Sequence, residues 1–260
     1  MIDTHCHLTF PQYENRLASV LEDAAAEGVT GAITISTTHA DAARALAIAE
    51  RYPAVWCSAG VHPLYSHEGP HDWGELERII RHPRCVAWGE LGLDNHYSDP
   101  PKETQLAVLE EHLDVIELAR PEVDKPVVVH CREAYAELIP ILERSSIPPE
   151  RFVFHCFTSD TADVTRCLDF GAMVSFTGMV TFKSADATRE AAQRVPSDRI
   201  MVETDAPFMT PAPYRKIKTC EPKHAATTAR FLAELRGEDW DTFHANINAN
   251  VQRFFGMTAV

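Results

Sequence analysis

The stretch Ile2-Asp3-Thr4-His5-Cys6-His7-Leu8 predicts a first β-strand with a metal site at its end. Successive side chains of a strand point to opposite faces, so His5 and His7 share one face. Two imidazoles side by side suit a single metal ion. Because histidines are also common in ordinary cores and on surfaces, the interpretation of this pair depends on the rest of the chain.

Short apolar runs alternate with amphipathic segments along the whole chain. Runs typical of buried strands occupy residues 2–8, 31–36, 54–61, 84–91, 126–130, 152–155, 172–176 and 200–204. Helical apolar spacing occupies residues 16–27, 39–51, 73–81, 102–119, 134–143, 162–170, 185–194, 225–235 and 240–255. Eight strand–helix units are the number that closes into a barrel, so we predict one α/β domain over residues 1–260, a TIM-like (β/α)8 barrel. An open doubly wound sheet is the alternative, but no glycine-rich nucleotide-binding motif supports it.

The composition predicts a cytoplasmic globular protein, and a monomer is favoured. The sequence has no apolar run of membrane-spanning length and no signal-peptide pattern, so we expect no membrane partner. Seven cysteines without a Cys-x-x-Cys spacing predict free thiols. The formal net charge of −14 opposes non-specific binding to a polyanion. A nucleic-acid substrate would need metal ions and a local basic cluster, for which residues 215–218 (Arg-Lys-Ile-Lys) are the best candidate and an ordinary solvated loop is the alternative.

Chemically active side chains occur where the predicted strands end. They are His5, His7, Glu90, His130, His155 and Asp205. In a closed barrel these positions converge at the C-terminal mouth. Each alone has an ordinary explanation, but together they would be buried polar groups without partners. Bound divalent cations remove that cost, and nitrogen and carboxylate ligands suit zinc, manganese, iron or nickel; six ligands predict two ions bridged by Glu90.

Taken in order, a set of motifs makes the chain resemble the TatD family of metal-dependent deoxyribonucleases, within the amidohydrolase-like barrels. The motifs are residues 3–8 (DTHCHL), 60–63 (GVHP), 89–94 (GELGLD), 126–130 (PVVVH), 155–157 (HCF), 175–178 (SFTG), 202–207 (VETDAP) and 250–255 (NVQRFF). The resemblance covers nearly the whole chain. It implies a TIM-like barrel with a divalent-metal site that hydrolyses phosphodiester bonds of DNA, often from the 3′ end.

The same resemblance implies a ligand set for each ion. One ion would be held by His5, His7, Glu90 and Asp205, and the other by Glu90, His130 and His155. Glu203 lies two residues before Asp205 on the same strand face, and it has two equal interpretations: a ligand of a third ion, or a residue that orients another ligand. We therefore expect two divalent ions, of zinc, manganese, magnesium, iron or nickel, with a third as the alternative.

The expected substrate is single-stranded DNA or a DNA 3′ end. In this hypothesis a water bound by two ions roughly 3.5–4 Å apart attacks the phosphodiester. Glu90 and Asp205 are the catalytic residues, and Asp205 accepts the proton of the water. His62, after the third strand, and Arg132, after the fifth, are candidates to hold a phosphate oxygen. The alternatives are a structural hydrogen bond for His62 and an ion pair with Glu133 for Arg132.

Three loops depart from the family pattern. Leu64 stands where a histidine is frequent, Asn95 and His96 replace aromatic residues, and Cys220 replaces an asparagine. These changes concern the choice of substrate and leave the metal ligands intact. A second hypothesis therefore keeps the metals and hydrolyses an amide or ester, in a small metabolite or an aminoacyl-tRNA. A third, a non-catalytic metal-binding scaffold, is disfavoured because the predicted ligand set leaves open positions at the mouth.

Overall fold

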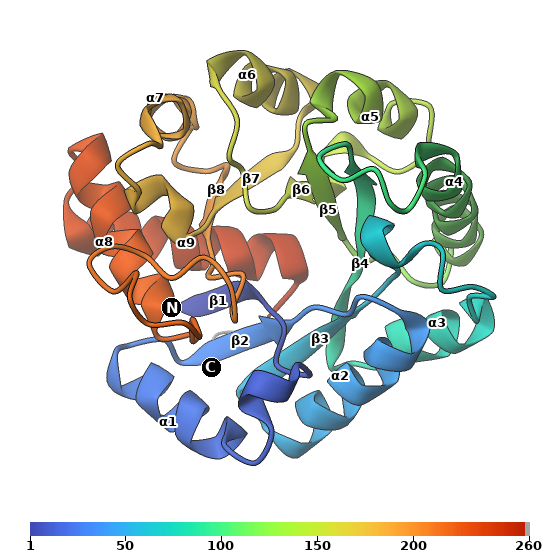
Figure 1. The fold of residues 1–260 in the computed structure, drawn as a ribbon, viewed down its shortest axis with the longest axis horizontal. Helices are drawn as coiled ribbons and strands as arrows, with labels where there is room; N and C mark the ends of the chain where they lie inside the picture. The colour runs from blue at the N-terminus through green and yellow to red at the C-terminus, as the bar shows by residue number, and fades with distance from the viewer. Residues whose placement is uncertain (258–260) are drawn as a thin grey trace.

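A single sheet of eight parallel strands forms the centre of the computed structural model, which describes residues 1–257. The strands are β1 (Ile2–Cys6), β2 (Gly31–Thr34), β3 (Val55–Ala59), β4 (Cys85–Asp94), β5 (Val127–Arg132), β6 (Phe152–Phe154), β7 (Met173–Phe176) and β8 (Ile200–Val202). Each strand pairs with the next in parallel. The predicted TIM-like (β/α)8 barrel is confirmed (Figure 1).

Nine helices lie within the described residues, and the first eight surround the strands as an outer ring (Figure 1). They are α1 (Leu17–Ala26), α2 (His39–Arg51), α3 (Trp73–Ile80), α4 (Lys102–Ala119), α5 (Tyr135–Leu142), α6 (Thr161–Phe170), α7 (Asp186–Arg194), α8 (His224–Arg236) and α9 (Trp240–Phe255). Short 3-10 turns occur at η1 (Pro11–Tyr13), η2 (Pro63–Tyr65), η3 (Pro149–Arg151) and η4 (Gly178–Thr181). No helix within residues 1–257 has the length and apolar character needed to cross a membrane.

Helix boundaries follow local sequence signals. The hydroxyl of Thr38 accepts the backbone N–H of Asp41 at 3.1 Å and so caps the N-terminus of α2. The apolar side chains that α2 buries have helical spacing, and they are Ala42, Ala45, Leu46 and Ala49. Because both signals are local, the predicted range 39–51 agrees with the structure.

The first and last strands of the barrel meet at their C-terminal ends. The N–H of Asp205 donates to the carbonyl of His5 at 2.8 Å, and the N–H of His7 donates to the carbonyl of Ala206 at 2.7 Å. The buried carboxylate of Asp3 accepts both the backbone N–H and the hydroxyl of Thr204, at 2.9 and 2.6 Å. These bonds hold the segment after β8 against β1, at the place where the predicted metal ligands lie.

Strand β4 runs to Asp94, three residues beyond its predicted end at residue 91. Two glycines allow β4 and β5 to approach closely. Gly89 has φ 109° and Gly92 has φ 144°, and a Cβ atom at Gly92 would clash with the carbonyl oxygen of His130. The longer strand places Glu90 and Asp94 on the same face, beside His130.

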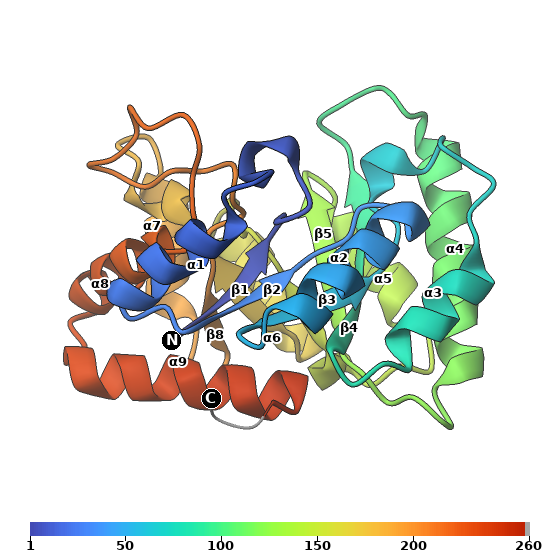
Figure 2. The same ribbon diagram turned by 90° about the horizontal axis from the view of Figure 1, so that it is seen from below.

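The interior of the barrel is apolar below its mouth. Its cluster contains Ile33, Ile35, Trp56, Val86, Ala87, Val128, Val153, Met173 and Met201. Phe254 and Phe255 of α9 pack against the same cluster, and the amide of Asn250 donates to the carbonyl of Ile200 at the start of β8 at 2.8 Å. Helix α9 lies across the N-terminal ends of the strands (Figure 2). The polar mouth is therefore at the opposite end.

The fully buried imidazole of His112 makes the barrel sensitive to acid. His112 lies on α4 between the rings of Trp73 and Trp88, with centroid distances of 5.1 and 6.1 Å. Burial lowers the pKa of His112 to about 3, so the imidazole stays neutral in the folded protein. The unfolded chain takes up a proton near pH 6.5, so the stabilisation from neutral His112 is lost as pH falls below that value.

We expect His112→Phe to reduce the acid-induced loss of stability by about 2 kcal/mol between about pH 7.5 and about pH 5. Urea unfolding at both pH values measures this difference. The exposed His67, changed to Phe, is the matched control and should behave as the wild type. An equal loss of stability with falling pH in the wild type and in His112→Phe would contradict the assignment.

Candidate metal centre

The six predicted ligands are brought together at the C-terminal ends of the strands. They come from β1 (His5) and the residue after it (His7), from β4 (Glu90) and β5 (His130), and from the residues after β6 (His155) and β8 (Asp205). Most line a cavity of about 370 Å³, and His5 lies fully buried beneath it. The barrel positions side chains that are up to 200 residues apart in the sequence.

Glu90 lies at the centre of the cluster and is only 1% exposed. Its Oε1 lies 2.9 Å from Nδ1 of His130 and 2.7 Å from Nε2 of His155. Its Oε2 faces the other side, 3.2 Å from Nε2 of His5. The two oxygens of one carboxylate therefore face two different groups of imidazoles.

Asp205 completes the group on the Oε2 side of Glu90. Its Oδ1 lies 3.3 Å from Nε2 of His7 and 3.7 Å from Nε2 of His5. Asp205 has a positive φ of 57°, a left-handed conformation that aspartate and asparagine tolerate better than most residues. This backbone turn directs the carboxylate toward the two imidazoles of β1.

Glu203 lies on the far side of His155 and is held by protein donors. Its Oε1 accepts the backbone N–H of Cys156 at 2.6 Å and lies 3.4 Å from Nδ1 of His155. The hydroxyl of Thr4 donates to its Oε2 at 3.3 Å. The ring of His155 is stacked on the ring of His5, with a centroid distance of 3.8 Å.

The donor set fits divalent cations. Three groups have ligand atoms within 4.8 Å of one another: His5, His7 and Glu90; His5, His155 and Glu203; and His62, Glu90 and His130. Within residues 1–257, buried atoms of three of these side chains make no hydrogen bond: both ring nitrogens of His5, Nδ1 of His155 and Oε2 of Glu90. The 3.2 Å approach of His5 to Glu90 thus lacks hydrogen-bond geometry. Buried polar atoms without partners are costly, and cations would satisfy them.

The charges of the cluster keep its carboxylates ionised. Burial raises the pKa of Glu90, but the surrounding imidazoles, led by His155, His62 and His5, lower it well below its ordinary value. Burial likewise raises the pKa of Asp205, and the hydrogen bond from His7 with the charge of His5 lowers it overall. Both side chains are therefore anionic at neutral pH, as ligands for cations must be.

Asp94 is a site residue that the sequence interpretation missed. Nε2 of His130 donates to Oδ2 of Asp94 at 2.9 Å, which leaves Nδ1 of His130 facing Glu90. Asp94 also accepts the backbone N–H of His96 at 2.9 Å. A carboxylate behind a ligand histidine fixes its tautomer and ring orientation. The available signal was spacing, because Asp94 follows Glu90 by four residues on one strand face.

The two predicted phosphate-binding residues line the same cavity. Nε2 of His62 lies 3.1 Å from Nδ1 of His130 and 3.4 Å from Oε1 of Glu90, within the group of potential ligands. Burial lowers the pKa of His62 to about 3, so the ring is neutral. The guanidinium of Arg132 stacks on the ring of Tyr97 at 5.2 Å from its centroid. The alternative ion pair of Arg132 with Glu133 is not formed within residues 1–257.

The loops that depart from the family pattern lie at or near the mouth. Leu64 lines the cavity, and its N–H donates to Nδ1 of His62 at 3.0 Å. His96, in the loop after β4, is exposed and pairs with Glu133 after β5 at 2.9 Å. The basic cluster at residues 215–218 is exposed and does not line the cavity, and its Arg215 stacks on the ring of Phe182.

A parallel barrel with buried histidines and carboxylates at its C-terminal mouth defines a metal-dependent barrel hydrolase. A family described as TatD related DNase matches residues 2–256, and the chain belongs to that family. It is similar to an uncharacterized metal-dependent hydrolase, YcfH, of Escherichia coli, with 35% identity over 100% of this chain and 97% of the relative. It is also similar to the 3′-5′ ssDNA/RNA exonuclease TatD of Citrobacter rodentium, with 31% identity over 99% of this chain and 98% of the relative. The fold is similar to the crystal structure of YJJV, a TatD homolog from Escherichia coli. The TM-score is 0.91, and the sequence identity is 30% over 99% of this chain and 98% of that chain.

Proposed function

We propose that this TatD-family hydrolase cleaves phosphodiester bonds of DNA and removes nucleotides from the 3′ end of a single strand. The position of Glu90 carries the proposal, because its two oxygens face separate groups of imidazoles and so suit a pair of divalent ions. When bound, such a pair supplies a water of lowered pKa and a clamp for the attacking and leaving oxygens. The exonuclease name of relatives that are 31–32% identical supports the same activity.

The shape of the cavity favours the end of a single strand. Its volume of about 370 Å³ lies near the lower end of the range for small-molecule sites, ~300–1,000 Å³. Glu90 lies at the base of this cavity, so a strand end reaches it more easily than the side of a duplex. Tyr97 and Phe208 line the cavity and are 51% and 46% exposed, and their rings offer stacking surfaces for unpaired bases.

Each polar side chain has a role in this proposal. The ions would be held by His5, His7, Glu90, His130, His155 and Asp205. Ionised Asp205 accepts the proton of the attacking water. The forked donors of Arg132 and the ring of His62 hold oxygens of the phosphate. Glu203 accepts protein donors at both oxygens and lies 3.4 Å from Nδ1 of His155, so in this proposal it holds His155 in place; the binding of a third ion with His5 and His155 is the alternative.

The proposal also places the enzyme in the cytoplasm, as a monomer. All seven cysteines are free, as expected of a protein in a reducing compartment. Six of the seven are buried, which fits a role in packing rather than in a disulfide framework.

Digestion of 3′- and 5′-labelled oligonucleotides tests the function and its direction. With manganese or zinc present, we expect the 3′ label to be released first and the 5′-labelled strand to shorten one nucleotide at a time. Single strands should be cut at least about tenfold faster than blunt duplexes, because bases must leave their partners to enter the cavity. A panel with bis(p-nitrophenyl) phosphate and amide substrates serves as the comparison. Turnover of amides alone would contradict the proposal.

A further inference from the structure

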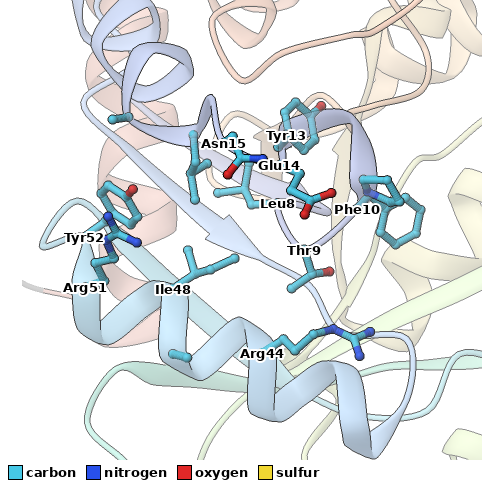
Figure 3. A pocket seen from close by; sticks show the side chains of 14 residues that line it. Leu8, Thr9, Phe10, Tyr13, Glu14, Asn15, Arg44, Ile48, Arg51 and Tyr52 are labelled. Atoms are coloured by element: carbon cyan, nitrogen blue, oxygen red, sulfur yellow. The ribbon is translucent and has the colours of Figure 1, made fainter.

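A second cavity, of about 750 Å³, lies beside the metal centre, between η1 with the start of α1 and the outer side of α2. Figure 3 shows its lining. Ile48 lies on the floor, Glu14 on the opposite wall, and Arg44 and Arg51 toward the two ends. Tyr52 lies beside Arg51. We call this cavity the α2 trough.

The α2 trough lies next to the mouth of the metal centre, and the ring of Phe10 stands between the two. Phe10 lines the trough, and its ring stacks on the ring of the predicted ligand His7 with a centroid distance of 5.0 Å. It also meets the exposed ring of Phe208 edge to face at 6.0 Å. A neighbouring hollow of about 410 Å³ shares Phe10 and Arg44 with the trough and extends to Tyr65, which contacts His62. The trough and this hollow, which Glu68 also lines, are therefore neighbours along α2, and both reach Phe10 beside His7.

The charge of the α2 trough is opposite to that of the whole protein. Its lining carries Arg44, Arg51 and one carboxylate, Glu14, whereas the chain has a formal net charge of −14. Within residues 1–257, the guanidinium of Arg51 makes no hydrogen bond or ion pair, and it contacts the ring of Tyr52 at 5.4 Å from the centroid. Arg44 uses one nitrogen to pair with Asp41 at 3.0 Å. Both residues are exposed and keep donors free for an anion.

The spacing of the two arginines suits a polyanionic strand. Arg51 follows Arg44 by seven positions, which is about two helical turns. The two side chains therefore lie on one side of α2, about 10.5 Å apart along its axis. Two arginines at this separation can contact different phosphates of one strand. The apolar side chain of Ile48 lies between the two arginines, and the rings of Phe10 and Tyr52 lie toward the ends of the trough; all three offer contacts for bases.

We infer that the α2 trough binds the nucleotides of the substrate strand that lie beyond the scissile phosphate. Arg44 and Arg51 contact their phosphates, and Phe10 guides the strand from the metal centre into the trough. This inference rests on the proposed function and adds a site that sets the preferred length of the substrate. A single strand is the occupant, because the arginines form a narrow row along one helix and not a broad basic face.

The affinity of the metal-loaded enzyme for oligothymidylates of different length tests the inference. Oligomers of roughly 3 to 12 nucleotides, capped by a 3′ phosphorothioate that resists hydrolysis, are titrated by fluorescence anisotropy. The wild type should bind the longest about tenfold more tightly than the shortest. In the double variant Arg44→Ala/Arg51→Ala, the affinity for the longest oligomer should exceed that for the shortest by less than about threefold. The slope of log Kd against log salt should also decrease by about 1.4, which is two phosphate contacts at about 0.7 each.

Arg78→Ala/Arg166→Ala is the matched control. Arg78 and Arg166 pair with an acidic residue three positions earlier, as Arg44 does, but lie on α3 and α6. The control changes the net charge equally and should keep the length dependence of the wild type. The single variant Arg51→Ala repeats the titration with oligomers of different length. Arg51 is exposed, so this variant should perturb the fold less than the double variant does.

The outcomes separate this inference from the proposed function. If the wild type degrades oligonucleotides but binds all lengths equally, or if both double variants lose the same affinity, the α2 trough is not a strand site and the proposed function stands. If the wild type hydrolyses no phosphodiester, the proposed function fails, and the substrate role of the trough fails with it.

Discussion

Asp205→Asn is expected to lower metal-dependent hydrolysis of single-stranded DNA by about a thousandfold while the barrel stays folded. The substitution keeps the size of the side chain but removes the negative charge and the proton acceptor beside His5 and His7. Loss of a general base costs about 10²- to 10⁴-fold, and a weakened metal site adds to that loss. Asparagine tolerates the left-handed backbone at this position, so the fold should be retained.

Initial rates on an oligonucleotide and circular dichroism spectra measure the two parts of this prediction. Asp169→Asn removes the same charge from an exposed position on α6 and should leave both unchanged. His130→Ala should reduce the rate by a similar factor, because it removes the ring between Glu90 and Asp94. Near wild-type rates of hydrolysis in both Asp205→Asn and His130→Ala would contradict the assignment of the metal centre.

Chelation is expected to have the second large effect. Removal of divalent ions should reduce hydrolysis to background and lower the melting temperature, because the buried ligand atoms lose their partners. Metal at a hundredfold excess over its Kd stabilises the folded state by about 2.7 kcal/mol. For a domain of this size, that energy corresponds to roughly 5–10 °C. Differential scanning fluorimetry with and without EDTA measures the shift, and added manganese or zinc should restore it.

The variant Glu90→Gln is the control for the effect of EDTA on the melting temperature. It removes the carboxylate that faces both groups of imidazoles, so EDTA should change its melting temperature by less than about 1 °C. Metal analysis should give two ions per wild-type chain and fewer in the variant. A wild type whose activity and melting temperature are both insensitive to EDTA would refute a metal-dependent function at this site.

Local patterns explain why the elements were predictable. The apolar spacing of α4 and α9 depends on neighbours within each helix, and their predicted ranges, 102–119 and 240–255, agree with the structure. The end of β4 was placed too early because Gly92 interrupts the apolar run at residue 91, although Leu93 continues it. The strand continues because Gly92 lets the backbone of β5 approach. This close approach depends on both strands, so the sequence of one strand alone does not predict it.

The sequence by itself determined the eight strand–helix units and the strand ends that carry His5, Glu90 and His130. Periodicity sets the type of an element and the face of each side chain, and both are short-range properties. The tertiary structure alone decided which atoms meet: the two oxygens of Glu90 against different imidazoles, Asp94 behind His130, and the α2 trough beside His7. Contacts of this kind join residues far apart in the sequence; the bond of Asp3 to Thr204, for example, joins residues 201 positions apart. Register and closure of the barrel set such distances, and no local pattern encodes them.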